Sequence, residues 1–271
     1  MEVPFVTPAL VQRLRQREID GAHARQQAVA NLPGNPYRAS AQVFGSTIAV
    51  KFNHPDMAGK NRVMGLCADS IDQLDDILDF YRRHDIACSL YAYEDDFADQ
   101  HRLTLMAKGV YQTGTNTTLY GLPPVEEIEP PAGVNVVEAG PQNFDLFMDL
   151  FRQGNEFGPA SWTLNEAFER AENSQSTYHL YIAYLNAIPA AVASLNIAAD
   201  IGSLAAASTL PTKRRHGCQS ALIHHRLRQS ALAGCDLVLG NAAPFSSSRH
   251  NMERAGLRLA CYGSSWRDGG E

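Results

Sequence analysis

A basic turn that leads into a helix is the segment of this sequence best suited to chemistry. Residues 208–222 read STLPTKRRHGCQSAL, in which Lys213, Arg214 and Arg215 precede Gly217 and a helix-forming run. The first N–H groups of a helix have no partner within the helix, and the helix dipole adds partial positive charge there. Glycine lets the backbone come close to a ligand. The pattern therefore predicts a site for an anion such as a pyrophosphate.

Other chemistries that these residue types can support lack the required spacing. Neither GxxxxGK[ST] nor GxGxxG occurs, which excludes the usual triphosphate and dinucleotide loops. His224 and His225 are adjacent on the predicted helix and point roughly 100° apart, so we expect no metal site. Cys218 lies at the helix start beside arginines, where the pKa of a thiol tends to fall. A backbone role in the anion site explains this cysteine better than a role as nucleophile.

The turn resembles the cofactor-binding signature of the GNAT superfamily of N-acetyltransferases. That signature is Arg/Gln-x-x-Gly-x-Gly/Ala at the start of a helix. Arg214, Gly217 and their register match it, whereas Gln219 replaces the final Gly or Ala. Farther along, residues 241–257 look like the family's next strand and helix, with Ser247, Ser248 and Asn251 in place.

The resemblance covers residues 134–266 well and residues 1–121 only as a degenerate copy without the basic loop. It implies that backbone amides of the loop hold the pyrophosphate of acetyl-CoA and that the preceding strand edge pairs with the pantetheine arm. The amide of Leu210 would polarise the thioester carbonyl. The residues so implied to bind the cofactor are Ser208, Thr209, Leu210, Arg214, Arg215, His216, Gly217, Cys218, Gln219, Ser220, Asn241 and Asn251.

The general acid and the general base stay open at this point. Many relatives carry a tyrosine acid four residues before the glycine that ends the next helix, but here that position is Met252, whose thioether cannot donate a proton. Tyr262, Ser248, a water molecule or no group at all could replace it. Glu156 is the first candidate for the base, and Asp200 is the second.

A segment rich in proline and glutamate divides the chain into two α/β halves. Residues 122–133, LPPVEEIEPPAG, carry four prolines and three glutamates, which favours an extended strap. We expect a degenerate GNAT-like domain over 1–121 and the acetyltransferase domain over 134–271. The resemblance implies that each is a mixed, mostly antiparallel sheet flanked by helices.

Hydrophobic periodicity and turn residues predict the elements of both halves, with Asp95 and Asp96 at one helix start. Helices are expected at 7–31, 70–85, 96–109, 143–158, 164–173, 216–234 and 246–256. Strands are expected at 42–52, 61–67, 87–94, 110–121, 134–139, 179–185, 189–198, 202–210, 235–242 and 257–263.

A helix–strand–helix–strand unit recurs within the chain. An interval of 147 residues separates three pairs of identical residues, namely Cys88 and Cys235, Leu90 and Leu237, and Gly109 and Gly256. Other identity between the halves is thin, so the repeat depends on element order and glycine placement. It predicts an ancient duplication of one domain.

Composition and charge exclude several classes of protein. With 45% apolar and 19% charged residues, the 271-residue chain is of ordinary globular type. A net charge of −6 argues against a nucleic-acid partner and does not favour an anionic membrane surface. Five widely spaced cysteines argue against a disulfide framework and fit a reducing cytoplasm. No signal peptide is visible, and the charge-free residues 173–199 alternate like two strands rather than a membrane span.

The expected function is direct transfer of an acetyl group from acetyl-CoA to the amino group of a small molecule, without a metal, by a monomer or homodimer. Phe157 and Trp162 could form apolar walls of the acceptor cleft, although anchoring a loop in the core is the more ordinary role. A non-catalytic acyl-CoA sensor or scaffold is the alternative, because the usual acid and base are missing. Acceptors on a protein or a charged tRNA also stay open.

Overall fold

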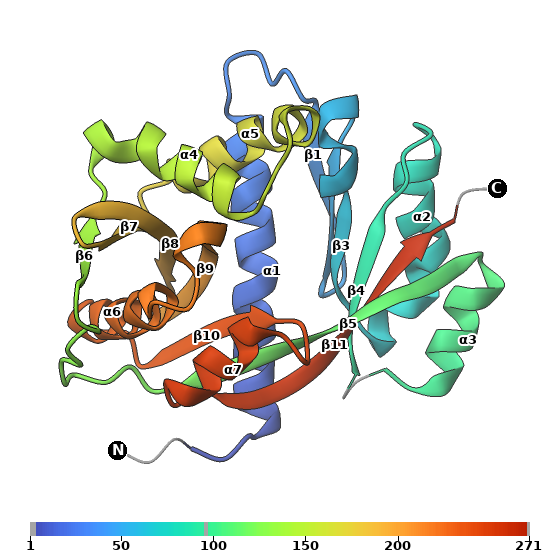
Figure 1. Ribbon diagram of the computed structural model, residues 1–271. Helices are drawn as coiled ribbons and strands as arrows, with labels where there is room; N and C mark the ends of the chain where they lie inside the picture. The colour runs from blue at the N-terminus through green and yellow to red at the C-terminus, as the bar shows by residue number, and fades with distance from the viewer. Residues whose placement is uncertain (1–3, 95–96, 270–271) are drawn as a thin grey trace. The chain divides into compact units, whose positions relative to one another are not determined.

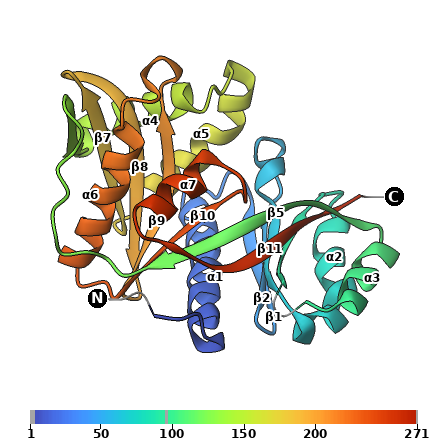
Figure 2. The same cartoon turned by 60° about the horizontal axis from the view of Figure 1, so that its bottom comes forward.

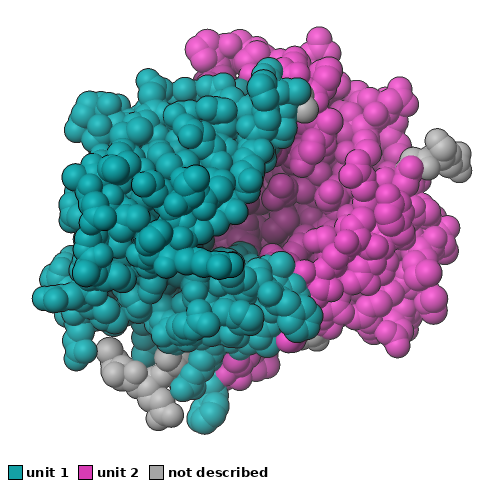
Figure 3. All heavy atoms as spheres, viewed as in Figure 1, with its two compact units in different colours: residues 1–5, 119–259 teal, residues 6–118, 260–271 magenta. Residues whose placement is uncertain are grey.

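The computed structural model describes residues 4–94 and 97–269, and the chain forms two compact units (Figure 1). Unit 1 comprises residues 1–5 and 119–259, and unit 2 comprises residues 6–118 and 260–271, as Figure 3 shows in two colours. Asp95 and Asp96, which were expected at a helix start, lie outside the described residues.

Unit 2 contains a sheet with helices on both faces. The strand order is β1-β2-β3-β4-β11-β5, and α1 packs against β1, β2 and β3. Its elements are α1 (Pro8–Ala30), β1 (Ala39–Phe44), β2 (Thr47–Phe52), β3 (Arg62–Leu66), α2 (Leu74–Arg82), β4 (Ser89–Tyr93), α3 (Asp99–Ala107), β5 (Val110–Gly121) and, from the other end of the chain, β11 (Arg258–Asp268).

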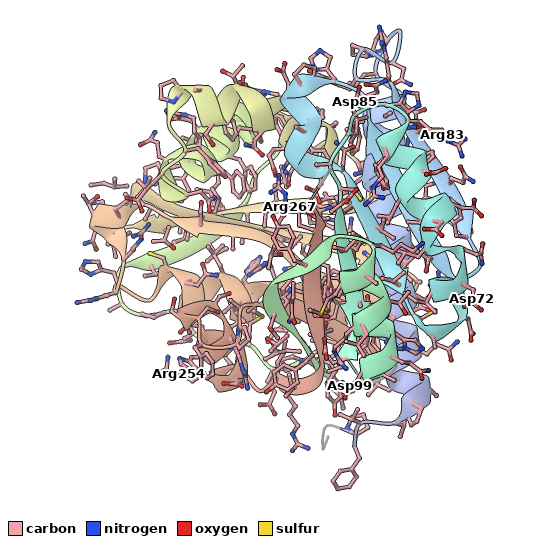
Figure 4. The ribbon with its side chains drawn as sticks, turned by 90° about the vertical axis from the view of Figure 1, so that its right-hand side faces the viewer. Asp72, Arg83, Asp85, Asp99, Arg254 and Arg267 are labelled. Carbon is pink, nitrogen blue, oxygen red and sulfur yellow. The ribbon has the colours of Figure 1, made fainter. Side chains whose placement is uncertain are left out.

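The helix α2 forms where the spacing of its apolar residues predicts it. Its buried residues recur at helical intervals and form one face against the core of unit 2: Leu74, Ile77, Leu78 and Tyr81. The phenol of Tyr81 donates to the carbonyls of two strands, at 2.9 Å each. The charged residues Asp72, Arg83 and Asp85 lie at the two ends of the helix (Figure 4).

The sequence predicts a single first strand in unit 2, where the structure has a hairpin of two strands. Residues 42–52 were expected to form a single strand, but the chain turns back at Gly45 and Ser46. There β1 and β2 pair antiparallel from Phe44↔Thr47 to Ala39↔Phe52. Gly45 has a φ of +60°, which glycine adopts without the steric cost that other residues incur. The result is a hairpin whose turn interrupts an otherwise continuous β-rich sequence.

The last strand of the chain completes the sheet of unit 2. In β11, Gly263 to Arg267 pair antiparallel with β4, and Trp266 is buried in the core of unit 2. Residues 260–271 therefore belong to unit 2, although the sequence analysis assigned them to the domain over 134–271. Conversely, Leu119 at the end of β5 is buried in the core of unit 1.

Unit 1 is a mixed, mostly antiparallel sheet. From the end of β5 the strand order is β5-β10-β9-β8-β7-β6, and the pair β9–β10 is parallel. Its elements are β6 (Val134–Glu138), α4 (Phe144–Gly154), α5 (Pro159–Asn173), β7 (Tyr178–Leu185), β8 (Ile188–Ala198), β9 (Ile201–Thr209), α6 (Cys218–Leu232), β10 (Leu237–Ala242) and α7 (Ser247–Arg254). The fold class that the sequence predicted is confirmed.

Helices cover both faces of the sheet in unit 1 (Figure 1). The residues Ala191, Ala193 and Leu195 of β8 pack in one core with α6, whereas Val192 packs in a second core with α4. This alternation follows from the two-residue period of a strand. The strands β8 and β9 are therefore held between two cores, and this fixes the backbone that will form the site.

The predicted internal repeat is confirmed at the level of element order. The elements β4, α3 and β5 begin 148 residues before β10, α7 and β11. In both units a helix connects two parallel neighbours, α2 between β3 and β4, and α6 between β9 and β10. Gly109 and Gly256 follow α3 and α7 with positive φ angles of 78° and 96°.

Candidate cofactor and catalytic site

The strands β9 and β10 separate at the place where the site forms. Their parallel ladder joins residues 201–204 of β9 to residues 237–240 of β10 and ends there. In the described chain, residues 205–209 thus have no ladder partner on the β10 side. Unpaired backbone N–H and C=O groups at such an edge are available to a ligand with amide groups of its own.

A bulge lies at the start of this open edge. Ala193 pairs with Ala207 and Leu195 with Leu204, so that two residues of β9 oppose the single residue Ser194 of β8. An extra residue of this kind bends the strand and locally changes the direction of its backbone groups. The bulge thus coincides with the point at which β9 leaves β10.

The expected role of Leu210 is wrong. Its N–H donates to the carbonyl of Ala190 at 2.9 Å and is therefore not available to a thioester. Because successive residues of a strand direct their N–H groups to opposite sides, Thr209 and Ala207 direct theirs away from β8 and towards the open edge. Ala207 was missed by the sequence analysis, since only the register of β9 against β8 shows which residues of the strand face outward.

The helix α6 begins at this same place. Gly217 is its N-cap residue, with a φ of +80°, and because glycine has no side chain it leaves the first N–H groups uncapped. Arg215, two residues earlier, also has a positive φ, of 67°. The start of α6 therefore presents uncapped amides with the positive end of a helix dipole, as the sequence predicted.

A second helix start lies close by. The helix α7 begins at Ser247. Its N-cap residue is Ser246, whose hydroxyl accepts a hydrogen bond from the backbone N–H of Arg249 at 3.2 Å. Figure 2 shows α6 and α7 next to β9 and β10. Arg254, labelled in Figure 4, donates to the side-chain oxygen of Asn251 at 3.1 Å.

A cavity of about 860 Å³ in unit 1 connects the open edge of β9 with both helix starts. This volume is within the usual range for small-molecule sites. Most of the residues predicted to bind the cofactor line it, and Leu210 and His216 do not. Those that line the cavity are Ser208, Thr209, Arg214, Arg215, Gly217, Cys218, Gln219, Ser220, Asn241 and Asn251.

The charges of the cavity wall are of one sign. Lys213, Arg214, Arg215 and Arg226 line it, and no aspartate or glutamate is among the described residues of its lining. A wall with four cationic side chains favours an anionic ligand. Arg214 is partly engaged already, because it donates to the carboxylate of Glu156 at 2.9 Å.

The predicted general base Glu156 is therefore an ion-pair partner of Arg214 rather than a group of the cavity lining. It has a φ of +57° in the loop between α4 and α5, and its side chain is largely exposed. The second candidate, Asp200, precedes the first residue of β9 and lies at the other end of that strand from the cavity.

The two candidate acids differ in position. Tyr262 belongs to β11 in unit 2 and does not line the cavity of unit 1. Ser248 lines the cavity, as does Met252, which lies four residues later on the same face of α7. Met252 is buried, and a Cβ on Gly240 would meet its sulfur.

Phe157 and Trp162 take the structural role that the sequence analysis considered more ordinary. Their rings stack with centroids 6.1 Å apart, and Phe157 also contacts Phe151, at 6.2 Å. Both pack against the core that α4 forms with β7 and β8. Neither residue lines the cavity.

Burial changes the expected chemistry of Cys218. The thiol lies at the start of α6, where the sequence predicted a lowered pKa, but burial raises its pKa instead. Desolvation of the thiolate therefore outweighs the backbone hydrogen bond at Cys218 and the charge of the nearby Lys213, both of which lower the pKa. This result supports a packing role for the side chain.

The described residues contain no group of three or more His, Cys, Asp or Glu side chains arranged to hold a metal ion. None of their helices combines the length and the apolar character that crossing a bilayer requires.

No protein-family model and no curated protein matches this sequence. Solved structures do match. A GCN5-related N-acetyltransferase from Kribbella flavida aligns over 92% of this chain and 96% of its own, with 18% identity and a TM-score of 0.64. A functionally unknown conserved protein from Staphylococcus epidermidis aligns over 90% of this chain and 100% of its own, with 10% identity and a TM-score of 0.61.

A tandem GNAT protein from the clavulanic acid biosynthesis pathway aligns over 93% of this chain and 94% of its own, with 14% identity and a TM-score of 0.56. Identities this low concern the fold, and the fold extends over nearly the whole chain. Taken with the repeated order of elements in the two units, these likenesses show that the chain has a tandem GNAT fold, as its loop motif implied.

Proposed function

We propose that the protein is an N-acyltransferase that transfers the acetyl group of acetyl-CoA to the amino group of a small molecule. The observation that carries this proposal is that the open edge of β9 and the uncapped start of α6 meet at one cavity. Coenzyme A has an extended arm with amide groups and a pyrophosphate, which these two features fit. The acetyltransferase fold supports the same function.

Each part of the cavity would take one part of the ligand. The amides of Gly217 to Ser220, with Lys213 and Arg215, would hold the pyrophosphate, because among the described residues no carboxylate forms an ion pair with either cation. The N–H groups of Thr209 and Ala207 would pair with the pantetheine arm and the thioester carbonyl. An N–H aimed at that carbonyl stabilises the negative charge that develops on its oxygen.

The proposed reaction is direct attack of the amine on the thioester. The neutral nitrogen attacks the carbonyl carbon, a C–N bond forms and the C–S bond breaks. The nitrogen loses one proton, and the leaving thiolate gains one and departs as the thiol of coenzyme A. Since the described lining of the cavity contains no carboxylate, we propose that water takes the proton from nitrogen and that Ser248 is the protein's candidate donor to sulfur.

Release of the free thiol of coenzyme A tests this proposal. The protein is incubated with acetyl-CoA and a panel of small amines, and a thiol reagent records the product. An amine-dependent rate above the rate without amine supports an enzyme. Saturable binding of acetyl-CoA without any such rate favours the alternative of an acyl-CoA sensor or scaffold, for which the absence of a carboxylate from the described lining is the specific observation.

Several parts of the expected function stay predictions. These are the small-molecule acceptor, the cytoplasmic location, and the monomeric or homodimeric state. We further propose that residues 134–259 carry the cofactor site and that unit 2, which lacks a basic glycine loop after β3, supports it without binding a cofactor of its own.

A further inference from the structure

One cation of the cavity wall is not explained by the binding of coenzyme A alone. Arg226 lies in the third turn of α6 and is 2% exposed, yet it lines the cavity beside Leu204 and Ala205. Arginine is almost never buried to this degree without a charged partner. Within the described part of the chain, no carboxylate forms an ion pair with Arg226.

Within the described part of the chain, the hydrogen bonds of Arg226 leave two of its five N–H groups without an acceptor. Its Nε donates to the carbonyl of Leu222 at 3.1 Å, and its Nη1 donates to the carbonyls of Ser194 and Ala205 at 3.0 and 3.5 Å. A guanidinium has five N–H groups. The two on Nη2 have no acceptor among the described residues, although the side chain borders the cavity.

The group nevertheless stays charged at neutral pH. Burial lowers the pKa of Arg226 to about 10, well above 7. Three carbonyl acceptors replace part of the lost hydration, but they carry no net negative charge. A buried cation of this kind gains most from an anion that brings a full charge and an acceptor for Nη2.

The point at which Arg226 contacts β9 indicates which end of the ligand it would meet. The basic turn and the start of α6 follow Thr209 in the chain, whereas the proposed thioester position, Ala207, comes before Thr209. Ala205, whose carbonyl Arg226 holds, lies two residues farther in the same direction. Arg226 is thus beyond the thioester, where the transferred acyl group and the attacking amine come together.

We propose that Arg226 binds a carboxylate at the reacting end of the ligands, carried either by a dicarboxylic acyl group on coenzyme A or by an amino-acid acceptor. This inference rests on the proposed function, since it uses the thioester position assigned there. The free Nη2 favours a carboxylate because it can donate a charge-assisted hydrogen bond to one of the carboxylate oxygens. Arg226 is on this account a specificity-determining residue.

The first test compares acyl chains of equal length with and without a terminal carboxylate. Calorimetry measures binding of glutaryl-CoA against pentanoyl-CoA, and of succinyl-CoA against butanoyl-CoA. If the carboxylate is on the acyl group, the wild-type protein binds the acidic member of each pair about tenfold more tightly or better, as a charge-assisted hydrogen bond implies.

The second test places the carboxylate on the acceptor. With saturating acetyl-CoA, KM is measured for glycine and β-alanine and for the matching amides glycinamide and β-alaninamide. If the acceptor carries the carboxylate, the acids have a KM about tenfold or more below that of the amides. The ratio within each pair is the readout, because a general loosening of the bulge changes both members alike.

Two variants assign the effect to the guanidinium. Arg226→Met removes the charge and should bring the ratio within each pair to between about one and two. Arg226→Lys keeps the charge and should retain part of the carboxylate preference. Circular dichroism and acetyl-CoA binding verify that each variant is folded. If acetyl-CoA binds but neither pair shows a carboxylate preference that depends on Arg226, this inference is overturned alone. If no acyl-CoA binds the folded wild-type protein, the proposed function is overturned with it.

Discussion

Replacement of Gly217 by alanine tests how much the backbone angle and the contact with Pro131 constrain the turn before α6. Gly217 has a φ of +80°, and a Cβ built on it would lie 2.6 Å from Cγ of Pro131 in the segment 122–133. Gly234, after the end of α6, has the same φ of +80° but no atom within 4 Å of its Cβ position. The two glycines thus separate the cost of the backbone angle from the cost of contact with Pro131.

The magnitudes follow from these two terms. An L-residue in the left-handed region costs about 1–2 kcal/mol, and overpacking against a fixed neighbour adds about 1–3 kcal/mol. We therefore expect Gly234→Ala to lower the free energy of unfolding by about 1–2 kcal/mol. For Gly217→Ala we expect a loss of about 2–5 kcal/mol, because both terms apply.

Urea denaturation of the two variants measures the difference, and a third variant isolates its source. Pro131→Ala removes the ring atom that the new methyl group would meet. In the Gly217→Ala background, Pro131→Ala should restore about 1–3 kcal/mol of the free energy of unfolding. Loss of the proline also makes the unfolded chain more flexible, which offsets a smaller part of this gain. Calorimetry with acetyl-CoA should show weaker binding for Gly217→Ala and unchanged binding for Gly234→Ala.

Two results would refute this reasoning. If both alanine variants lose the same free energy and Pro131→Ala recovers none of it, then Pro131 does not constrain the turn. If Gly217→Ala lowers stability but leaves the affinity for acetyl-CoA unchanged, then the turn does not hold the ligand.

Three further predictions concern proton transfer, pH and thiol reactivity. Ser248→Ala should lower kcat by about tenfold or less, because a thiolate is a weak base, whereas Tyr262→Phe should leave kcat unchanged; a loss confined to Tyr262→Phe would contradict the assignment. Burial lowers the pKa of His225, so the folded state favours the neutral ring. The contribution of His225 to the free energy of unfolding should therefore be full above about pH 6.5 and decrease as the pH drops below that value. Thermal unfolding of His225→Gln between pH 7 and 5 should show a smaller decrease in stability than the wild type. Iodoacetamide with peptide mass mapping should find Cys67 modified before Cys218, whose pKa burial raises; the reverse order would refute a buried, neutral Cys218.

Elements with strong local signals could be predicted from the sequence. The helix α2 has apolar residues at regular helical spacing from Leu74 to Tyr81, and the start of α6 has a basic turn followed by Gly217. Both depend on neighbours in the chain, so local physics decides them. The hairpin of β1 and β2 was missed because Gly45 and Ser46 make a short turn inside a run of strand-forming residues.

Features that depend on pairing between distant segments could not be predicted in this way. The assignment of the thioester amide to Leu210 was wrong because its N–H bonds to Ala190, and the bulge opposite Ser194 sets which N–H groups face outward. The pairing of β11 with β4 joins residues far apart in sequence, and no periodicity within β11 indicates its partner.

The ion pair between Arg214 and Glu156 illustrates the same limit at the site. Each residue was singled out for its own chemistry, one for the anion and one as a base, and nothing in their sequence spacing indicates that they bind each other. Their 2.9 Å contact depends on how the loop after α4 approaches the turn after β9. The corresponding chemical roles therefore changed once the fold brought the two segments together.

Calorimetric titration of the folded protein with acetyl-CoA is the most direct test of the central claim that the open edge of β9 and the start of α6 hold one nucleotide thioester. The account predicts saturable binding of one molecule per chain, with a dissociation constant in the micromolar range, and weaker binding for Arg215→Ala. A wild-type protein that is folded by circular dichroism yet gives no heat of binding would contradict it.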